Sequence, residues 1–103
     1  MLDRAWQAVV VLALATAGAP AGAAGANLGR DVAANCASCH GTDGRSRGDM
    51  PSLAGRDKAS VMQEVRDFRD GKRPSTVMQQ VAKGYTDAEI EAAAAYFALQ
   101  KAD

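Results

Sequence analysis

Two thiols and one imidazole stand together in the run Cys36-Ala37-Ser38-Cys39-His40. Two cysteines separated by two residues and followed at once by a histidine form the pattern for covalent attachment of a c-type haem. Each thiol can add across one haem vinyl group to form a thioether, and the adjacent imidazole can place a neutral ring nitrogen on the iron. The chemistry predicted for this chain is therefore that of a haem iron.

Other kinds of site share parts of this pattern. A Cys-x-x-Cys pair also occurs in disulfide-exchange proteins, but there it stands in strand-rich βαβ surroundings that this sequence lacks. A structural zinc site needs about four Cys or His ligands, and Cys36, Cys39 and His40 are the only such residues in the chain. A plain disulfide would leave His40 unexplained. Haem attachment is therefore the favoured interpretation.

The N-terminal segment has the features of an export signal. The apolar run Ala8–Ala17 has the length of a signal-peptide core and is too short for a permanent membrane span. Small residues follow, and Ala24-Gly25-Ala26 fits a signal-peptidase site. We therefore expect residues 1–26 to be a signal peptide and residues 27–103 to be a periplasmic haem domain. An uncleaved N-terminal anchor is the alternative, because the residues before the apolar run carry no net side-chain charge.

The length and the charge of the chain exclude some other classes of function. The chain has 103 residues, with 12 Lys and Arg against 12 Asp and Glu, which suits one small domain without a basic surface for nucleic acid. A partner should therefore recognise local patches. Several cationic residues fall in predicted loops or near helix ends, where they could pair with haem propionates or an acidic partner. These are Arg45, Arg47, Arg56, Arg69, Lys72 and Arg73.

Apolar periodicity and capping residues predict the helices that position the haem-attachment run. The first covers Leu28–Asn35 behind a candidate N-cap at Asn27 and leads into a haem-binding turn. The second begins near the Asx cap Asp57 and stops at Gly71.

The remaining elements are also helical. A short helical turn over Met78–Lys83 closes at Gly84, and the last helix starts with Thr86 and Glu89 in a capping box. That helix carries several apolar residues on one face: Ile90, Ala94 and Phe97. No strand-like alternation of useful length is present, so the predicted fold is all-α.

The composition of the chain reduces the number of candidates for the sixth iron ligand. His40 is the only histidine, so a second imidazole from the same molecule is excluded. A methionine, lysine or tyrosine, an external ligand and an open site remain as candidates. Met50 follows in a segment that must pass near the proximal side, and Met62 lies beside an apolar helix stripe, where a thioether usually fills space. Met78 follows a turn-rich stretch that could fold back over the opposite face.

Three motifs follow one another after the predicted signal. They are Cys36-Ala37-Ser38-Cys39-His40-Gly41, then Pro51-Ser52-Leu53-Ala54-Gly55, then Met78. This order resembles class I cytochromes c over essentially all of residues 27–103. The segment 75–85 is similar to the cytochrome subunit of flavocytochrome c sulfide dehydrogenases and to single domains of periplasmic dihaem cytochromes. The resemblance implies a small all-α class I cytochrome c fold, with about three to five helices around one covalently bound haem c.

The resemblance also implies roles for single residues. Cys36 and Cys39 would carry the haem, while His40 and Met78 would be the axial iron ligands. The carbonyl group of Pro51 would accept a hydrogen bond from the outer ring nitrogen of His40, which holds the ring and raises its basicity.

Packing around the haem can be predicted in the same way. In these cytochromes a glycine of the N-terminal helix crosses an aromatic residue of the C-terminal helix, which implies Gly29 against Tyr96 or Phe97. Only glycine allows so close a backbone approach. The predicted apolar shell of the haem is Leu53, Val61, Val65, Phe68, Val77 and Val81.

With both axial positions filled, the iron would exchange electrons without binding substrate. We therefore predict an electron carrier or electron-transfer subunit, not an enzyme. It would accept electrons from a redox partner such as a flavoprotein dehydrogenase that oxidises sulfide, the partner suggested by the resemblance. The alternative is a haem enzyme or gas-binding sensor with an open sixth site.

Overall fold

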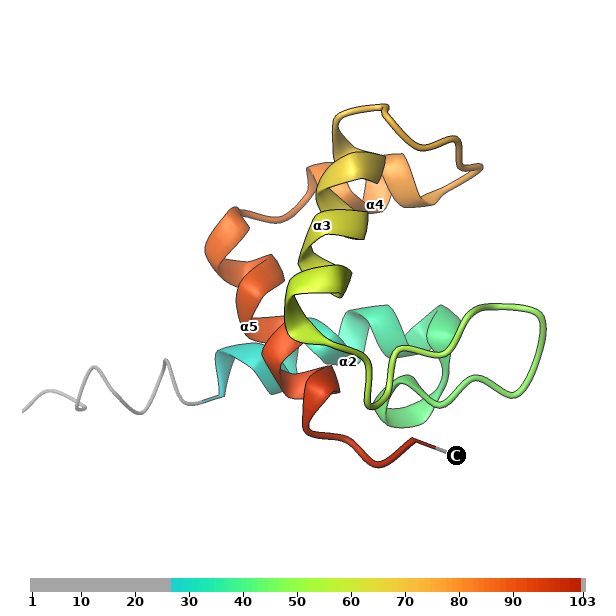
Figure 1. Ribbon diagram of the computed structural model, residues 1–103, viewed down its shortest axis with the longest axis vertical. Coiled ribbons are helices and arrows are strands. Elements are labelled where there is room, and N and C mark those ends of the chain that lie inside the picture. The colour runs from blue at the N-terminus through green and yellow to red at the C-terminus, as the bar shows by residue number, and fades with distance from the viewer. Residues whose placement is uncertain (1–26, 103) are drawn as a thin grey trace, which may run out of the picture.

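The computed structural model describes residues 27–102, which form an all-α domain (Figure 1). Its elements are α2 (Leu28–His40), the 3-10 helix η2 (Thr42–Gly44), α3 (Lys58–Arg69), α4 (Met78–Lys83) and α5 (Asp87–Ala98). No strand occurs among these residues, and the predicted fold class is confirmed. Within the same range no helix combines the length and the apolarity that crossing a bilayer requires. The predicted signal peptide, residues 1–26, lies outside the described residues.

Side-chain caps explain where two of the helices begin. The carboxylate of Asp57 accepts a hydrogen bond from the backbone N–H of Ser60 at 3.0 Å, at the start of α3. At the start of α5, Thr86 and Glu89 exchange the two bonds of a capping box, at 3.1 and 2.8 Å. Such bonds satisfy N–H groups that a helix leaves without partners. With α4 spanning Met78–Lys83, the predicted starts of these three helices are confirmed.

The first helix begins at Leu28 as predicted but differs from the prediction in its end and in its cap. α2 does not stop at Asn35 but continues through Cys36–His40. None of these residues breaks a helix, and α2 ends only before Gly41, whose φ of 92° suits a residue without a side chain. The expected cap, Asn27, has helical backbone angles and makes no side-chain capping bond. The predicted end and cap were therefore wrong, and the haem-attachment run is helical.

α5 is the element against which both α2 and α3 pack. At the crossing with α2, a Cβ atom on Gly29 would lie 2.5 Å from the carbonyl oxygen of Ala92 and 3.4 Å from Cβ of Tyr96. The predicted approach of Gly29 to Tyr96 is thus present. The buried cluster between the two helices consists of Phe97 and three smaller residues, Val32, Ala33 and Ala93. Small side chains allow the two helix backbones to come close together.

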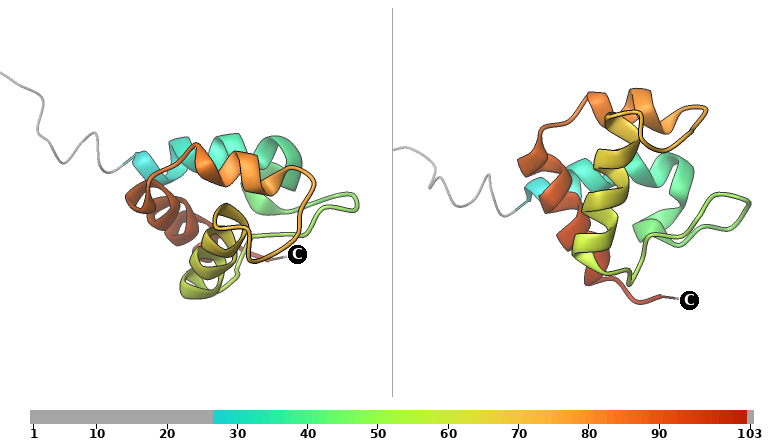
Figure 2. Two further views of the ribbon diagram at one scale, coloured as in Figure 1. Left: turned by 90° about the horizontal axis from the view of Figure 1, so that it is seen from above. Right: turned by 45° about the horizontal axis from the view of Figure 1, so that its top comes forward.

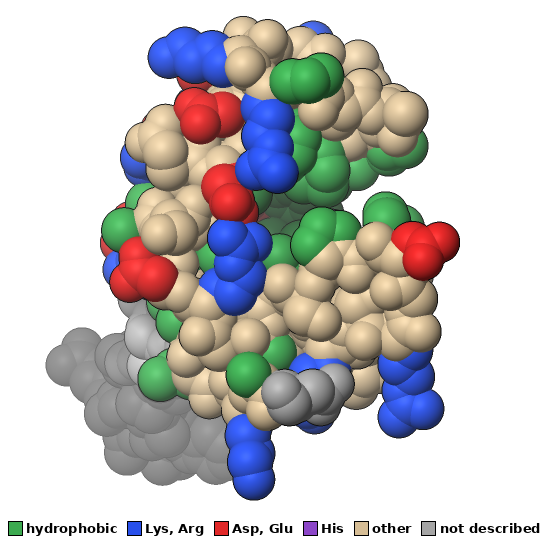
Figure 3. Space-filling model, turned by 45° about the vertical axis from the view of Figure 1, so that its right-hand side comes forward, with side chains coloured by type: hydrophobic (Ala, Val, Ile, Leu, Met, Phe, Trp, Pro, Cys, Tyr) green, Lys and Arg blue, Asp and Glu red, His purple; other side chains and the backbone are tan. Residues whose placement is uncertain are grey.

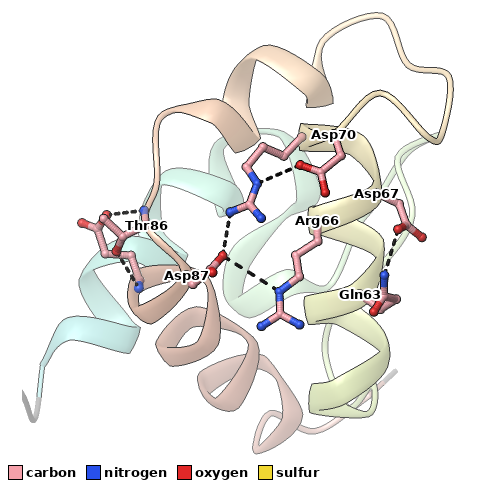
Figure 4. Close-up of polar contacts among 8 residues, drawn as sticks. Gln63, Arg66, Asp67, Asp70, Thr86 and Asp87 are labelled. Carbon is pink, nitrogen blue, oxygen red and sulfur yellow. Dashed lines mark hydrogen bonds and ion pairs between the residues drawn. The ribbon is translucent and has the colours of Figure 1, made fainter.

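Ion pairs tie the C-terminal part of α3 to the first residue of α5 (Figure 4). The carboxylate of Asp87 lies 2.6 Å from the guanidinium of Arg69 and 3.9 Å from that of Arg66. Hydrogen bonding to Arg69 lowers the pKa of Asp87. Along α3 itself, Gln63 donates a hydrogen bond to Asp67 at 2.8 Å. The ion pairs of Asp87 thus connect the C-terminal turns of α3 to the start of α5.

Candidate functional site

A hollow lined with hydrophobic side chains opens on one side of the domain (Figure 3). α4 lies across from the C-terminal half of α2, and a view from above places one over the other (Figures 1 and 2). α4 packs against α3, whereas α2 and α4 share no extended contact among the described residues. Val77 and Val81, at the start of α4, are 55% and 38% exposed. Apolar side chains gathered around an open hollow mark a binding site for an apolar group.

His40, the last residue of α2, is only 8% exposed. Its Nδ1 atom lies 2.7 Å from the carbonyl oxygen of Pro51. Because a carbonyl oxygen only accepts hydrogen bonds, Nδ1–H is the donor, and Nε2 keeps its lone pair. The bond fixes the orientation of the ring and raises the basicity of Nε2. His40 is therefore prepared as a nitrogen ligand for a metal ion.

Two further hydrogen bonds hold the loop that carries Pro51. The backbone N–H of Leu53 donates to the carbonyl oxygen of Gly44 at 2.7 Å. The hydroxyl of Ser52 accepts from the backbone N–H of Ser46 at 2.9 Å. The loop is thus closed at its base, next to the carbonyl group that contacts the imidazole.

Gly44 is a site residue that the sequence analysis missed. Its φ is 83°, and a Cβ atom there would lie 2.7 Å from Cδ1 of Phe97. Only glycine fits this position, because a side chain would meet both a strained backbone and a buried ring. A glycine four residues after His40 is a weak signal by itself, and nothing in the sequence points to Ser52 as the residue that closes the loop.

The two cysteines share a helix face with His40. Cys36, Cys39 and His40 all belong to α2, and residues three and four positions apart are neighbours on a helix surface. Both thiols are free; Cys36 is half-buried and Cys39 is exposed. Burial raises the pKa of the Cys36 thiol. The helical form of this run therefore presents two thiols and one imidazole together, a donor set that fits a covalently held haem.

The methionines considered as ligands have different surroundings. Met78 is the half-buried first residue of α4, the helix that borders the hollow opposite α2. Met62 is half-buried within α3, and Met50 is 43% exposed in the loop beside Pro51. Across residues 27–102, no three His, Cys, Asp or Glu side chains group closely enough to hold a metal ion.

The residues of the predicted apolar shell of the haem differ in their solvent exposure. Val61 is 5% exposed, and Leu53 packs partly against the buried cluster between α2 and α5. The other predicted members keep more exposed surface: Val65, Phe68, Val77 and Val81. These residues have apolar surface left with which to contact a bound group.

Three of the arginines considered for propionate pairing form ion pairs within the protein. Arg56 lies 2.8 Å from the carboxylate of Glu64, and Arg73 lies 3.4 Å from it. Arg69 is bound to Asp87. The ion pairs of Arg56 and Arg73 connect the segments on either side of α3 to that helix, and that of Arg69 connects α3 to α5.

The helical architecture and the Cys-x-x-Cys-His run at the end of α2 define a small all-α domain of the class I cytochrome c type. A family model described as "Cytochrome C oxidase, cbb3-type, subunit III" matches residues 20–97. The chain therefore belongs to this family of c-type cytochromes.

Individual relatives agree with this assignment. The cytochrome subunit of sulfide dehydrogenase from Chlorobaculum tepidum is 45% identical over 69 residues, covering 67% of this chain and 63% of the relative. Cytochrome c4 of Pseudomonas aeruginosa is 36% identical over 93 residues, covering 89% of this chain and 46% of the relative. A solved cytochrome c4 structure from Acidithiobacillus ferrooxidans matches with a TM-score of 0.62 and 31% identity, covering 69% of this chain and 49% of that chain.

The chain thus spans less than two thirds of the sulfide dehydrogenase subunit and about half of the cytochromes c4. Relatives of this kind are named as cytochrome subunits, cytochromes c and electron acceptors. The domain is accordingly a c-type cytochrome domain, similar to proteins whose names associate them with electron transfer.

Proposed function

We propose that the domain is an exported electron carrier whose haem c is attached to Cys36 and Cys39 and ligated by His40 and Met78. The observation that carries this proposal is the setting of His40. Its Nδ1 is engaged by Pro51 at 2.7 Å, so that Nε2 is the nitrogen left for the iron. When bound, the haem supplies a one-electron Fe(III)/Fe(II) couple.

The position of Met78 supports its role as the sixth ligand. It begins the helix that lies across the hollow from α2, where His40 ends. No second histidine is available in the chain. A thioether ligand favours ferrous iron and raises the reduction potential relative to harder ligands. A half-buried Met78 would also restrict access of water and small ligands to the iron.

The chain's own residues would control how the electron leaves. Val77 and Val81 are the exposed apolar residues at the N-cap of α4 and within it, and they would cover part of the haem edge with apolar surface. A low-polarity rim limits the reorganisation of solvent that accompanies a change of charge. The partly open edge then remains the route to a redox partner.

We propose a periplasmic dehydrogenase as that partner, with a sulfide-oxidising flavoprotein as the first candidate. The support is the name of the relative from Chlorobaculum tepidum, a cytochrome subunit of sulfide dehydrogenase. The balanced net charge of the chain predicts weak long-range steering, which suits a standing complex. Retention of a flavoprotein by the affinity-tagged, haem-loaded chain, purified from its own host, would test the partner.

The ligation is tested by the ferric spectrum of the holoprotein and of methionine variants. Thioether ligation gives a weak far-red charge-transfer band, so wild-type protein should show this band and Met78→Ala should lose it. Met50→Ala and Met62→Ala are matched controls that should keep it. Loss of the band in Met62→Ala alone would reassign the ligand. A wild-type ferric protein without the band, and binding cyanide without delay, would instead favour a haem enzyme or gas sensor with an open sixth site.

A further inference from the structure

The segment that connects α3 to α4, residues 70–77, leads directly into Met78; we call it the 70–77 loop. Every residue of this loop is exposed. An exposed segment gains little stability from apolar burial, so its position depends on specific polar contacts. Among the loop's side chains, Arg73 makes both a cation–π contact and an ion pair with α3.

Arg73 joins the 70–77 loop to two successive turns of α3. The backbone N–H groups of Lys72 and Arg73 both donate to the carbonyl oxygen of Asp67, at 2.8 and 3.2 Å. The guanidinium carbon of Arg73 lies 4.7 Å from the centroid of the Phe68 ring, a cation–π distance. Its NH1 atom lies 3.4 Å from Oε1 of Glu64. The loop is therefore attached to α3 through main-chain bonds and through the Arg73 side chain.

Glu64 is itself fixed from its other side. Arg56, which lies before α3, approaches both carboxylate oxygens of Glu64 at 2.8 Å. A two-point arginine–carboxylate contact defines the orientation of the carboxylate. Hydrogen bonding to Arg56 also lowers the pKa of Glu64. The partner that Arg73 finds on α3 is thus a pre-oriented anion.

The other end of the loop is coupled to the ligand-bearing helix. The backbone N–H of Gln79 donates to Oγ of Ser75 at 3.0 Å, across the first turn of α4. Only a few residues separate Arg73 from Met78. A displacement of Arg73 away from α3 is therefore transmitted to the residue that begins α4.

We propose that Glu64 and Arg73 are positioning residues for the sixth iron ligand, because their contact holds the 70–77 loop against α3 and so keeps the sulfur of Met78 in place. This inference rests on the proposed ligation by Met78. The inference adds that Glu64 and Arg73 determine the fraction of molecules in which this ligand has left the iron. Neither residue touches the iron, and their effect acts through the loop.

The experiment measures how fast imidazole replaces the internal ligand in the ferric holoprotein. At low imidazole concentration the observed rate is proportional to the fraction of molecules in which the internal ligand has left the iron. Arg73→Gln should raise this rate about three- to tenfold, the size expected from losing an exposed ion pair together with a cation–π contact. Glu64→Gln should raise it by a smaller factor, because the contact of Arg73 with Phe68 remains. The double variant should gain less than the product of the two single effects, because both break the same contact.

Two matched controls separate loop anchoring from charge and from global stability. Lys72→Gln removes the same charge from the neighbouring loop residue, whose side chain forms no ion pair or hydrogen bond with residues 27–102. Asp87→Asn weakens the tie between α3 and α5 without removing a contact of Arg73 or Glu64. Asp87→Asn should lower the thermal midpoint measured by circular dichroism and leave the rate of imidazole binding unchanged. Lys72→Gln should also leave that rate unchanged.

Each outcome decides the proposal. Equal rates for Arg73→Gln and Lys72→Gln would overturn it, as would a double variant in which the two effects multiply fully. A rate increase in Asp87→Asn as large as in Arg73→Gln would show that ligand release follows general destabilisation. If the wild-type ferric protein lacks the far-red band, the failure belongs to the ligation by Met78 and not to the positioning role.

Discussion

The imidazole of His40 and the carbonyl group of Pro51 meet at 2.7 Å although they lie in separate segments, the end of α2 and the loop before α3. The contact is short for an N–H···O bond. Because it uses Nδ1, it determines which ring nitrogen remains free and how the ring is turned. The loop therefore has a direct influence on the electronic character of the proposed iron ligand.

Loosening this contact should raise the reduction potential. Pro51→Ala keeps the carbonyl group but frees the backbone angle that proline fixes, which weakens the bond to His40. A less basic imidazole stabilises ferric iron less. A loss of about 0.5–1 kcal/mol in this bond corresponds to a rise of about 20–40 mV for a one-electron couple. Potentiometric titration of the holoprotein measures it; an unchanged or lower potential would contradict the prediction.

A methyl group at the crossing of α2 and α5 should destabilise the fold. Gly29→Ala would place Cβ 2.5 Å from the carbonyl oxygen of Ala92, a backbone atom that cannot move aside easily. Overpacking of this kind costs about 1–3 kcal/mol in the free energy of unfolding, measured by denaturant titration of the holoprotein. Gly48→Ala is the matched control, since its Cβ would meet nothing within 4 Å, and it should change stability by less than about 0.5 kcal/mol.

Two helix starts that look alike in sequence should respond differently to alanine. Thr86→Ala removes the side-chain oxygen that accepts from the backbone N–H of Glu89 at 3.1 Å and should cost about 1 kcal/mol of stability. Asn27→Ala should have almost no effect, because Asn27 makes no capping bond. A similar loss in both variants would mean that Asn27 caps α2 in solution after all.

The ion pair at Glu64 should give acid-dependent stability. Hydrogen bonding to Arg56 holds the pKa of Glu64 below its usual value. For a carboxyl group with a lowered folded-state pKa, the contribution is complete above the unfolded value of about 4.3 and is lost as pH falls through the folded value. Wild-type holoprotein should therefore be more stable than Glu64→Gln at pH 7, and the difference should shrink below about pH 4. A difference that stays constant down to pH 3 would argue against this assignment.

Local signals were sufficient where a helix start depends on neighbours in the sequence. The caps Asp57 and Thr86 and the bounds of α4 could be predicted because the donor and acceptor lie within a few residues of each other. The end of α2 could not, because the Cys36–His40 run by itself does not distinguish a turn from a helix. Its residues tolerate a helix, and only the backbone angle of Gly41 ends it.

Contacts between distant segments were predictable only where a resemblance supplied them. The approach of Gly29 to Tyr96 and the bond from His40 to Pro51 were expected on that basis. The partner of Arg73 was not, because an arginine in a loop can turn to solvent, to a bound anion or to a nearby carboxylate. The choice depends on where α3 places Glu64, which follows from the packing of the whole domain.

The bare backbone contact at Gly29 also has a mechanical consequence. Since no side chain separates the two backbones there, a shift of α2 along α5 would bring neighbouring side chains into collision with the facing backbone. We therefore expect α2 and α5 to keep a fixed relative position. α3, by contrast, contacts α5 through side-chain packing and ion pairs, and α4 packs against α3. We therefore expect a change in the distance between α2 and α4 to come from movement of α3 and α4 rather than of α2 and α5.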